Sequence, residues 1–255
     1  MVAGKATGGS VNAAEKVLRT LDALPDNPRL GDLAKATDLP KSTVHRILQT
    51  MVSEGFVVLD ESSGNYSPGP RLLGLAGRTF SRADTSSGAE PMLHRLQQET
   101  GATVHLAVLS GDEAVYVRKV EGNKPYRMVS RIGMAIPLHC TGIGKAILAG
   151  MSDAEVRAYA KRTGLARRTP NTVTDAKRLV TEVESIRQRG WAADLEENEI
   201  GIVCVGAGVR DHTGAITAAV SVSQLESDQA GVPLDELGPL VARRAAEIST
   251  AFGAL

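Results

Sequence analysis

The sequence predicts an α+β protein with two domains: an N-terminal winged helix-turn-helix over residues 10–69 and a mixed α/β domain over residues 88–255. Two observations lead to this prediction. Apolar residues recur with helical spacing up to residue 54 and are followed by a short hairpin pattern. Beyond residue 88, strand-like runs alternate with helical ones, which is typical of a sheet covered by helices.

The N-terminal domain is predicted to contain three helices. Residues 1–9 are rich in glycine and are expected to be disordered, and Ser10 is a candidate N-cap for the first helix. A second helix fits residues 30–37, and Pro40 suits the entrance to a third. This third helix, residues 41–54, carries its apolar side chains on one face, at Val44, Ile47, Leu48, Met51 and Val52.

A hairpin and a linker complete this half of the chain. Gly55 ends the third helix, and residues 56–59 and 66–67 predict two strands around a polar turn. The run Pro68-Gly69-Pro70 then breaks the pattern. Residues 70–87 predict an amphipathic linker helix that ends in the polar run DTSSG, where we expect the domains to join.

The outward face of the third helix predicts DNA binding. It is rich in hydrogen-bond donors and lacks carboxylates, and Arg46 and Gln49 can reach base edges in a major groove. Any solvated helix face collects polar residues, but a short helix, a tight turn, a Ser-Thr-rich helix start and a wing, in that order, favour a DNA-binding protein. The candidate DNA contacts are Lys41, Ser42, Thr43, His45, Arg46 and Gln49, with Asn65 and Tyr66 on the wing.

The second domain is predicted as a sheet with helices packed on it. Strand patterns occur at residues 103–109, 114–120, 126–132, 201–209 and 215–223. Helical patterns occur at 91–99, at 141–151, after the capping box at Ser152, from Thr174 to Gly190, and from Pro233 onward.

Composition limits the partners. The 29 basic and 29 acidic side chains balance, so DNA affinity per domain should be modest and a homodimer spanning two half-sites is expected. Two cysteines without a C-x-x-C pattern indicate a reducing compartment. The chain shows no signal peptide and no long apolar run, so we expect a cytoplasmic protein without membrane association and without a cofactor.

The stretch HCTGIGKA, residues 139–146, suggests enzymatic chemistry at first sight. It departs from the phosphate-binding pattern G-x-x-x-x-G-K-[ST] at its first and last fixed positions, His139 and Ala146. If the segment is extended, His139 and Cys140 point to opposite faces and do not share a proton. Both catalytic interpretations are therefore disfavoured.

Five separated stretches resemble the IclR family of bacterial transcriptional regulators. They are SVNAAEKVLRTLDAL, LAKATDLPKSTVHRILQTMVSEGFV, YSPGPRLLGL, PLHCTGIGKAILA and WAADLEENEIGIVCVGAGVRD, and they follow in the family's order. The resemblance implies a winged helix-turn-helix, a linker helix and a GAF-like effector domain for a small organic acid or related metabolite. It also implies dimers, often paired into tetramers, whose operator affinity the ligand alters. Family members include repressors and activators, and a repressor is our prediction.

The resemblance also implies an effector site. Family members hold a small carboxylate by backbone amides of the glycine turn, an acidic side chain, a cysteine, two serines and apolar walls. The matching positions are Gly142, Ile143, Asp194, Cys204, Ser221 and Ser223, with Met128 and Ile136 as walls. This sequence departs from the family pattern at Cys140, Gly206, Gly208 and Gln224.

The residues themselves support part of this site. Ser221 and Ser223 share a strand face, and Cys204 shares one with Gly206 and Gly208, which should leave space beside its sulfur. Amides at the helix start would attract an anion.

Simpler interpretations remain open at this stage. Cys204 could be a small buried side chain, Asp194 a solvated edge, and the glycines of the turn merely tight-turn residues. Lys145 is expected in a salt bridge. His105 and His139 could line the cavity or approach a metal with Cys140, but no regular metal-ligand spacing supports a metal site. An enzyme-like domain acting on a small acid through a cysteine, and a ligand-independent architectural DNA binder, are the competing hypotheses.

Overall fold

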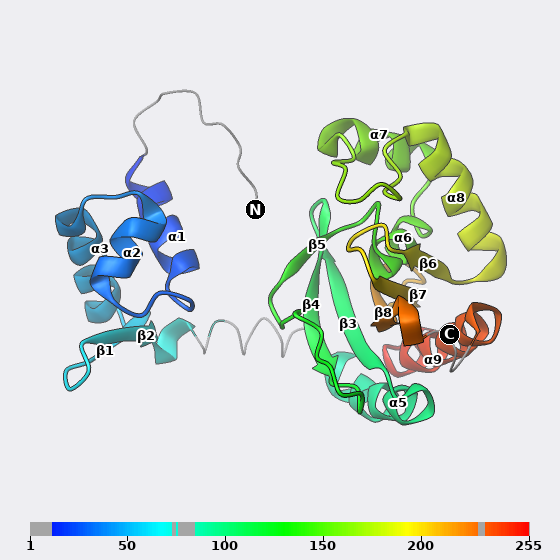
Figure 1. Cartoon of the computed structure of the whole chain (residues 1–255), viewed down its shortest axis with the longest axis horizontal. Coiled ribbons are helices and arrows are strands. Elements are labelled where there is room, and N and C mark those ends of the chain that lie inside the picture. The colour runs from blue at the N-terminus through cyan, green and yellow to red at the C-terminus, as the bar shows by residue number, and fades with distance from the viewer. Residues whose placement is uncertain (1–11, 73–74, 76–84, 229–232, 255) are drawn as a thin grey trace. The chain divides into compact units, whose positions relative to one another are not determined.

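The structure is a computed structural model that describes residues 12–72, 75, 85–228 and 233–254. The chain divides into two compact units, Met1–Arg82 and Ala83–Leu255, which are described separately (Figure 1). The predicted disordered segment 1–9, the candidate cap Ser10 and most of the predicted linker helix 70–87 lie outside the described residues.

The N-terminal unit is a winged helix-turn-helix. It contains α1 (Ala13–Ala23), α2 (Leu30–Thr37), α3 (Lys41–Ser53), β1 (Val57–Asp60) and β2 (Asn65–Pro68). The two strands pair antiparallel as the wing. One core joins the elements, and its buried members are Leu24, Leu33, Val44, Leu48, Met51, Val57 and Tyr66.

Local signals explain most boundaries in this unit. Asp38, in the left-handed region at φ 54°, ends α2, and Pro40 precedes α3 as expected. The first helix is capped by Asn12, whose side chain accepts a hydrogen bond from the Glu15 amide at 2.8 Å. The helix therefore begins with a cap two residues after the predicted Ser10.

The C-terminal unit is built on a six-stranded antiparallel sheet of order β5-β4-β3-β8-β7-β6. The strands are β3 (Thr103–Ser110), β4 (Glu113–Val120), β5 (Ala135–Pro137), β6 (Ala192–Leu195), β7 (Ile202–Arg210) and β8 (Ile216–Leu225). A one-turn 3-10 helix follows at Glu226–Asp228. The sequence did not predict β6, a strand of only four residues.

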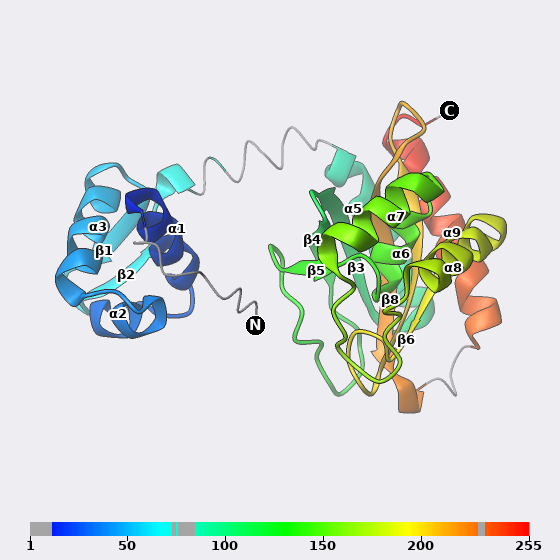
Figure 2. The ribbon, with the colours of Figure 1, turned by 90° about the horizontal axis from the view of Figure 1, so that it is seen from above.

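Helices cover both faces of this sheet (Figures 1 and 2). On one face lie α5 (Thr85–Thr100) and α9 (Leu234–Ala251). On the other face α6 (Gly142–Leu148) contacts the strands, beside α7 (Asp153–Thr163) and α8 (Ala176–Arg189). A hydrophobic core lies between the sheet and this second group of helices. The predicted α+β fold class is thus confirmed.

Three local predictions in this unit are wrong. Residues 126–132 form no strand, because the Lys119 ammonium binds the carbonyl oxygens of Met128 and Ser130 at 2.8 and 2.7 Å in place of a partner strand. The polar run after Ala83 is helical from Thr85, and Gly88 of this helix packs against α9. The cap of α8 is Asp175, which accepts from the Arg178 amide, and not Thr174.

Two glycines allow the turn before α6 to pack closely. A Cβ on Gly144 would lie 2.2 Å from the Cα of Leu138, and one on Gly206 of β7 would lie 2.5 Å from the carbonyl carbon of Gly142. The backbone at the start of α6 therefore lies directly on β7. The expected free space beside Cys204 is filled, at Gly206, by this backbone.

We expect Gly144→Ala to lower the free energy of unfolding by about 1–3 kcal/mol, because the added methyl group overpacks the Leu138 backbone. Urea unfolding followed by circular dichroism measures the effect. Gly31→Ala in α2 is the matched control, because a Cβ there meets nothing within 4 Å. Equal stability of the Gly144→Ala protein and its parent would show that this contact is not tight.

Candidate functional site

The exposed face of α3 is the candidate DNA-binding surface. Val44 and Leu48 are fully buried against the unit, whereas the opposite face is open to solvent. Among the predicted contacts, Lys41, Ser42, His45, Arg46 and Gln49 are exposed and Thr43 is half-buried.

The wing differs from the prediction. The Tyr66 side chain is buried in the core of the unit, so we withdraw it as a DNA contact, and Asn65 is half-buried. At the tip of the wing, Ser62 and Ser63 donate hydrogen bonds to the Asp60 carboxylate and hold its pKa at about 2. The wing turn is therefore acidic at physiological pH.

A polar row crosses the sheet of the C-terminal unit. Asp194 on β6 pairs with Cys204 on β7, which pairs with Ser223 on β8. Ser221 pairs with Gly206 on one side and His105 of β3 on the other. Because directly paired residues project to the same face, these side chains lie together on the face that α6 covers. Asp194, Ser221 and Ser223 are at most 5% exposed.

Hydrogen bonds connect this row. The Cys204 thiol donates to Ser223 Oγ at 3.1 Å, and Ser223 Oγ lies 3.4 Å from Nδ1 of His105. The other ring nitrogen, Nε2, lies 2.7 Å from Oγ of Ser130, which belongs to residues 126–132, the covering segment of this sheet. Tyr116 stacks on His105 with ring centroids 4.6 Å apart. The sequence raised His105 only as a residue that could line the cavity, and it did not assign Ser130 or Tyr116 to the site.

The row is not arranged for thiol catalysis. Burial, and to a smaller extent the charge of Lys119, lowers the pKa of His105 to about 3, so the imidazole is neutral. Burial also raises the pKa of the Cys204 thiol above its ordinary value. A catalytic cysteine needs the opposite arrangement, a thiolate beside a cationic group.

The remaining predicted site residues surround the row. The Gly142 backbone lies against Gly206, and the Ile143 side chain belongs to the hydrophobic core together with Ile136. Met128 is half-buried in the covering segment that Lys119 holds. Amides at the start of α6 thus lie against the sheet, while Ile136 is a core residue on the short edge strand.

His139 and Cys140 have separate partners. The segment is a turn and not an extended strand, yet the ring nitrogens of His139 contact the Tyr159 hydroxyl at 3.3 Å and the Ala166 carbonyl at 3.1 Å. The Cys140 sulfur lies 4.0 Å from the Asn198 side chain, and burial raises the pKa of its thiol to about 12. Within the described ranges, no group of three His, Cys, Asp or Glu side chains is placed to hold a metal ion.

A buried ion cluster lies beside the row. The Lys145 ammonium, fully buried in α6, binds Glu182 of α8 and Glu197 of the loop after β6. Asp194 accepts hydrogen bonds from the backbone N–H groups of Glu197, at 2.8 Å, and Asn198, at 3.3 Å. The predicted salt bridge of Lys145 is therefore confirmed, and the interpretation of Asp194 as a solvated edge is excluded by its 2% exposure.

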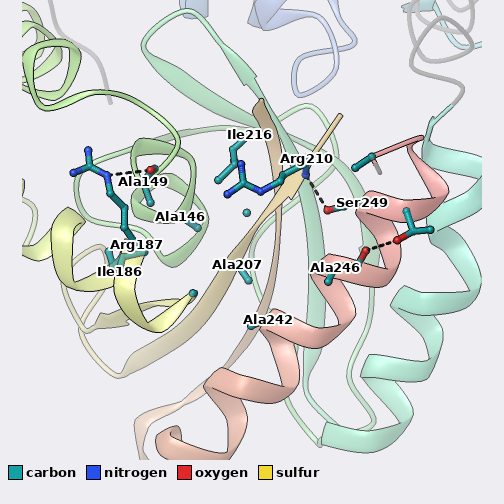
Figure 3. Close-up of a pocket in the computed structure, with 14 residues that line it drawn as sticks. Ala146, Ala149, Ile186, Arg187, Ala207, Arg210, Ile216, Ala242, Ala246 and Ser249 are labelled. Atoms are coloured by element: carbon teal, nitrogen blue, oxygen red, sulfur yellow. Dashed lines mark hydrogen bonds between the residues drawn. The ribbon is translucent and has the colours of Figure 1, made fainter. Parts of the chain in front are cut away.

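A cavity of about 450 Å³ lies elsewhere in this unit, at the far end of β7 between α8 and α9 (Figure 3). Its wall consists mainly of alanine and glycine. The Arg187 guanidinium at its rim is already bound by Asp153 and by the carbonyl oxygens of Ala149 and Met151. The polar row offers more recognition chemistry than this cavity, so we take the row as the candidate effector site.

A winged helix-turn-helix unit joined to a unit with a buried polar site is the organisation of a one-component transcriptional regulator. Residues 13–61 match the IclR helix-turn-helix domain, and residues 77–250 match the bacterial transcriptional regulator IclR C-terminal domain. The chain therefore belongs to the IclR family.

Individual relatives agree with this assignment. The transcriptional repressor AllR of Escherichia coli K12 is 31% identical over 237 residues, covering 93% of this chain and 88% of its own. The regulator XynR of the same strain is 33% identical over 220 residues, covering 85% of this chain and 87% of its own. No helix in the described part of the chain is long and apolar enough to cross a membrane.

Two solved structures are similar over nearly the whole chain. The Thermotoga maritima IclR protein has a TM-score of 0.78 at 35% identity and covers 95% of this chain and 99% of its own. An IclR homologue from Microbacterium hydrocarbonoxydans, complexed with 4-hydroxybenzoate, has a TM-score of 0.80 at 25% identity and covers 93% and 97%.

We expect Lys145→Met to destabilise the C-terminal unit by about 3–5 kcal/mol, because it leaves Glu197 buried without a counter-charge. Lys145→Met combined with Glu197→Gln should recover much of the loss. Urea unfolding measures both, and Lys161→Met, at an exposed position in α7, is the control. If the single and double variants were equally stable, the buried charge would not be the cause.

Proposed function

We propose that this protein is a repressor that binds operator DNA through α3 and binds a small organic acid at the polar row, and that the acid changes operator affinity. The observation that carries the proposal is the row itself. Hydroxyl, thiol and carboxyl groups of three neighbouring strands are gathered in a buried site, at the point where the start of α6 lies on the sheet. Such groups recognise polar ligands and do not stabilise a core.

The relatives support the choice of ligand class and the sign of regulation. The homologue from Microbacterium hydrocarbonoxydans was crystallised with 4-hydroxybenzoate, an aromatic carboxylic acid. AllR of Escherichia coli is a repressor. The specific acid that this chain recognises depends on the residues in which it departs from its family, among them Cys140 and Gly206.

A homodimer follows from the same proposal. The exposed α3 face presents a single recognition helix per chain. Two such helices on adjacent half-sites supply the affinity that a chain without net charge does not reach alone.

We expect Arg46→Ala to weaken operator binding by about 1–3 kcal/mol, about 5- to 150-fold, because it removes a donor that can reach a base edge. The operator is selected from random-sequence DNA with the purified protein, and affinity is measured at matched salt. Arg19→Ala removes the same charge from α1, where Arg19 pairs with Glu15, and should have a much smaller effect. Equal losses in the two variants would mean that α3 does not recognise bases.

We expect an acid that binds the C-terminal unit to change operator affinity by about 5- to 150-fold. Ser223→Ala should reduce both acid binding and this response, because Ser223 joins Cys204 and His105 in the row. Thr217→Ala, exposed near the start of the same strand, is the control. Small acids are screened by thermal shift, and operator affinity is then measured with and without the acid. A bound acid that leaves operator affinity unchanged would refute the sensor proposal.

A further inference from the structure

Asp194 is a buried carboxylate that uses only one of its oxygens. Oδ1 accepts both backbone hydrogen bonds, from Glu197 and Asn198. Within the part of the chain that the structure describes, no group donates to Oδ2. The side chain is 2% exposed and lies beside Cys204 in the polar row. Oδ2 is therefore the acceptor that this carboxylate has left for a ligand.

The charges around Asp194 do not favour a second anion. The nearest cation, Lys145 of α6, is shared by Glu182 of α8 and Glu197. Glu197 is itself buried, and its Oε2 has no hydrogen-bond partner. Glu182 and Glu197 bind the Lys145 ammonium, and Asp194 is a third carboxylate near it. The cluster therefore has a net negative charge when all three carboxylates are ionised.

The other titratable groups that face the row do not supply a spare positive charge. His105 on β3, Tyr116 on β4, Cys204 on β7 and Cys140 before α6 are in their neutral forms, because burial shifts each pKa toward the neutral species. Further out, Lys119 of β4 binds Glu121 and the covering segment, the Arg168 guanidinium of the loop after α7 donates to the Asn198 carbonyl, and Glu199 is exposed.

We propose that the protein binds its acidic effector together with one proton, which is held between the effector carboxylate and Oδ2 of Asp194. The proposal rests on the function proposed above and adds the way in which that site neutralises its ligand. Two carboxylates at hydrogen-bond distance do not both ionise in a buried site, so one proton shared between them is the stable arrangement. The proton comes from solvent and returns to it when the effector leaves.

The state of Asp194 in the free protein agrees with this role. Burial raises the pKa of Asp194 to about 7, against the lowering effects of the Glu197 amide and of Lys145. The carboxyl is therefore protonated below about pH 7 and loses its proton above it. Because the effector binds to the protonated form of Asp194, its affinity is constant below about pH 7. Well above this pH, the affinity for the effector falls about tenfold per pH unit.

The test uses the full-length protein and a panel of acetate, pyruvate, benzoate and 4-hydroxybenzoate. Binding is measured by calorimetry from about pH 6 to about pH 8.5, in two buffers with different ionisation enthalpies, which gives the number of protons taken up. We expect uptake approaching one proton and an affinity loss of about tenfold per unit at the alkaline end.

Asp194→Asn provides the decisive comparison. The amide keeps an acceptor for the two backbone N–H groups and permanently donates where the shared proton would lie. We expect this variant to bind the same acid without proton uptake and without a pH slope, and at about pH 8.5 more tightly than the parent. Glu197→Gln is the matched control in the same cluster and should keep the slope.

The outcomes separate this inference from the proposed function. An acid that binds the parent protein at about pH 8.5 without proton uptake, or an Asp194→Asn protein that keeps the slope, overturns the shared proton and leaves the sensor intact. If Glu197→Gln loses the pH slope and Asp194→Asn keeps it, Glu197 holds the proton, and the assignment to Asp194 is overturned. If no acid in the panel binds at any pH, the proposed function fails, and the inference fails with it.

Discussion

The contact between the start of α6 and β7 determines the geometry of the C-terminal unit. Gly142 and Gly206 meet backbone to backbone, and a Cβ on Gly206 would lie 2.5 Å from its neighbour. This contact holds α6 against the face that carries Ser221 and Cys204, so the amides of the turn and the polar side chains of the strands share one small volume. A glycine-rich turn that resembles a phosphate cradle in sequence thus owes its glycines to close packing. The departure from the family at Gly206 has the same explanation.

The ion cluster of Lys145 fixes the same helix from its other side. One ammonium connects α6, α8 and the loop after β6, and this loop presents the amides that bind Asp194. The electrostatics of the polar row and the packing of the helices are therefore coupled. A change of charge at Asp194 acts on the Lys145 ammonium, which also binds Glu182 of α8. In the sensor proposed above, this connects ligand binding to the position of α8. The cluster also explains why a lysine is tolerated at a fully buried position.

Much of the fold could be predicted from sequence because its signals are local. Three of these signals depend on only a few neighbouring residues: the apolar face of α3, the capping box at Ser152, and the position of Ser221 and Ser223 on the same strand face. Predictions were wrong where distant groups intervened: Lys119 replaces a partner strand for residues 126–132, and the core of the winged unit takes Tyr66 inward. The contact between His105 and Ser130 was missed because it depends on how the covering segment lies on the sheet, which no local pattern records.

In the proposed sensor, the covering segment affects how fast a ligand exchanges as well as how tightly it binds. Tyr126 accepts a hydrogen bond from the Leu225 amide, and Ser130 contacts His105, so the segment is attached to the sheet on both sides of Met128 and closes the polar row. A ligand enters and leaves such a site only when these attachments break, and its exchange rate is then limited by opening and not by diffusion. In the sensor proposed above, the occupancy of the polar row would therefore change no faster than this segment opens.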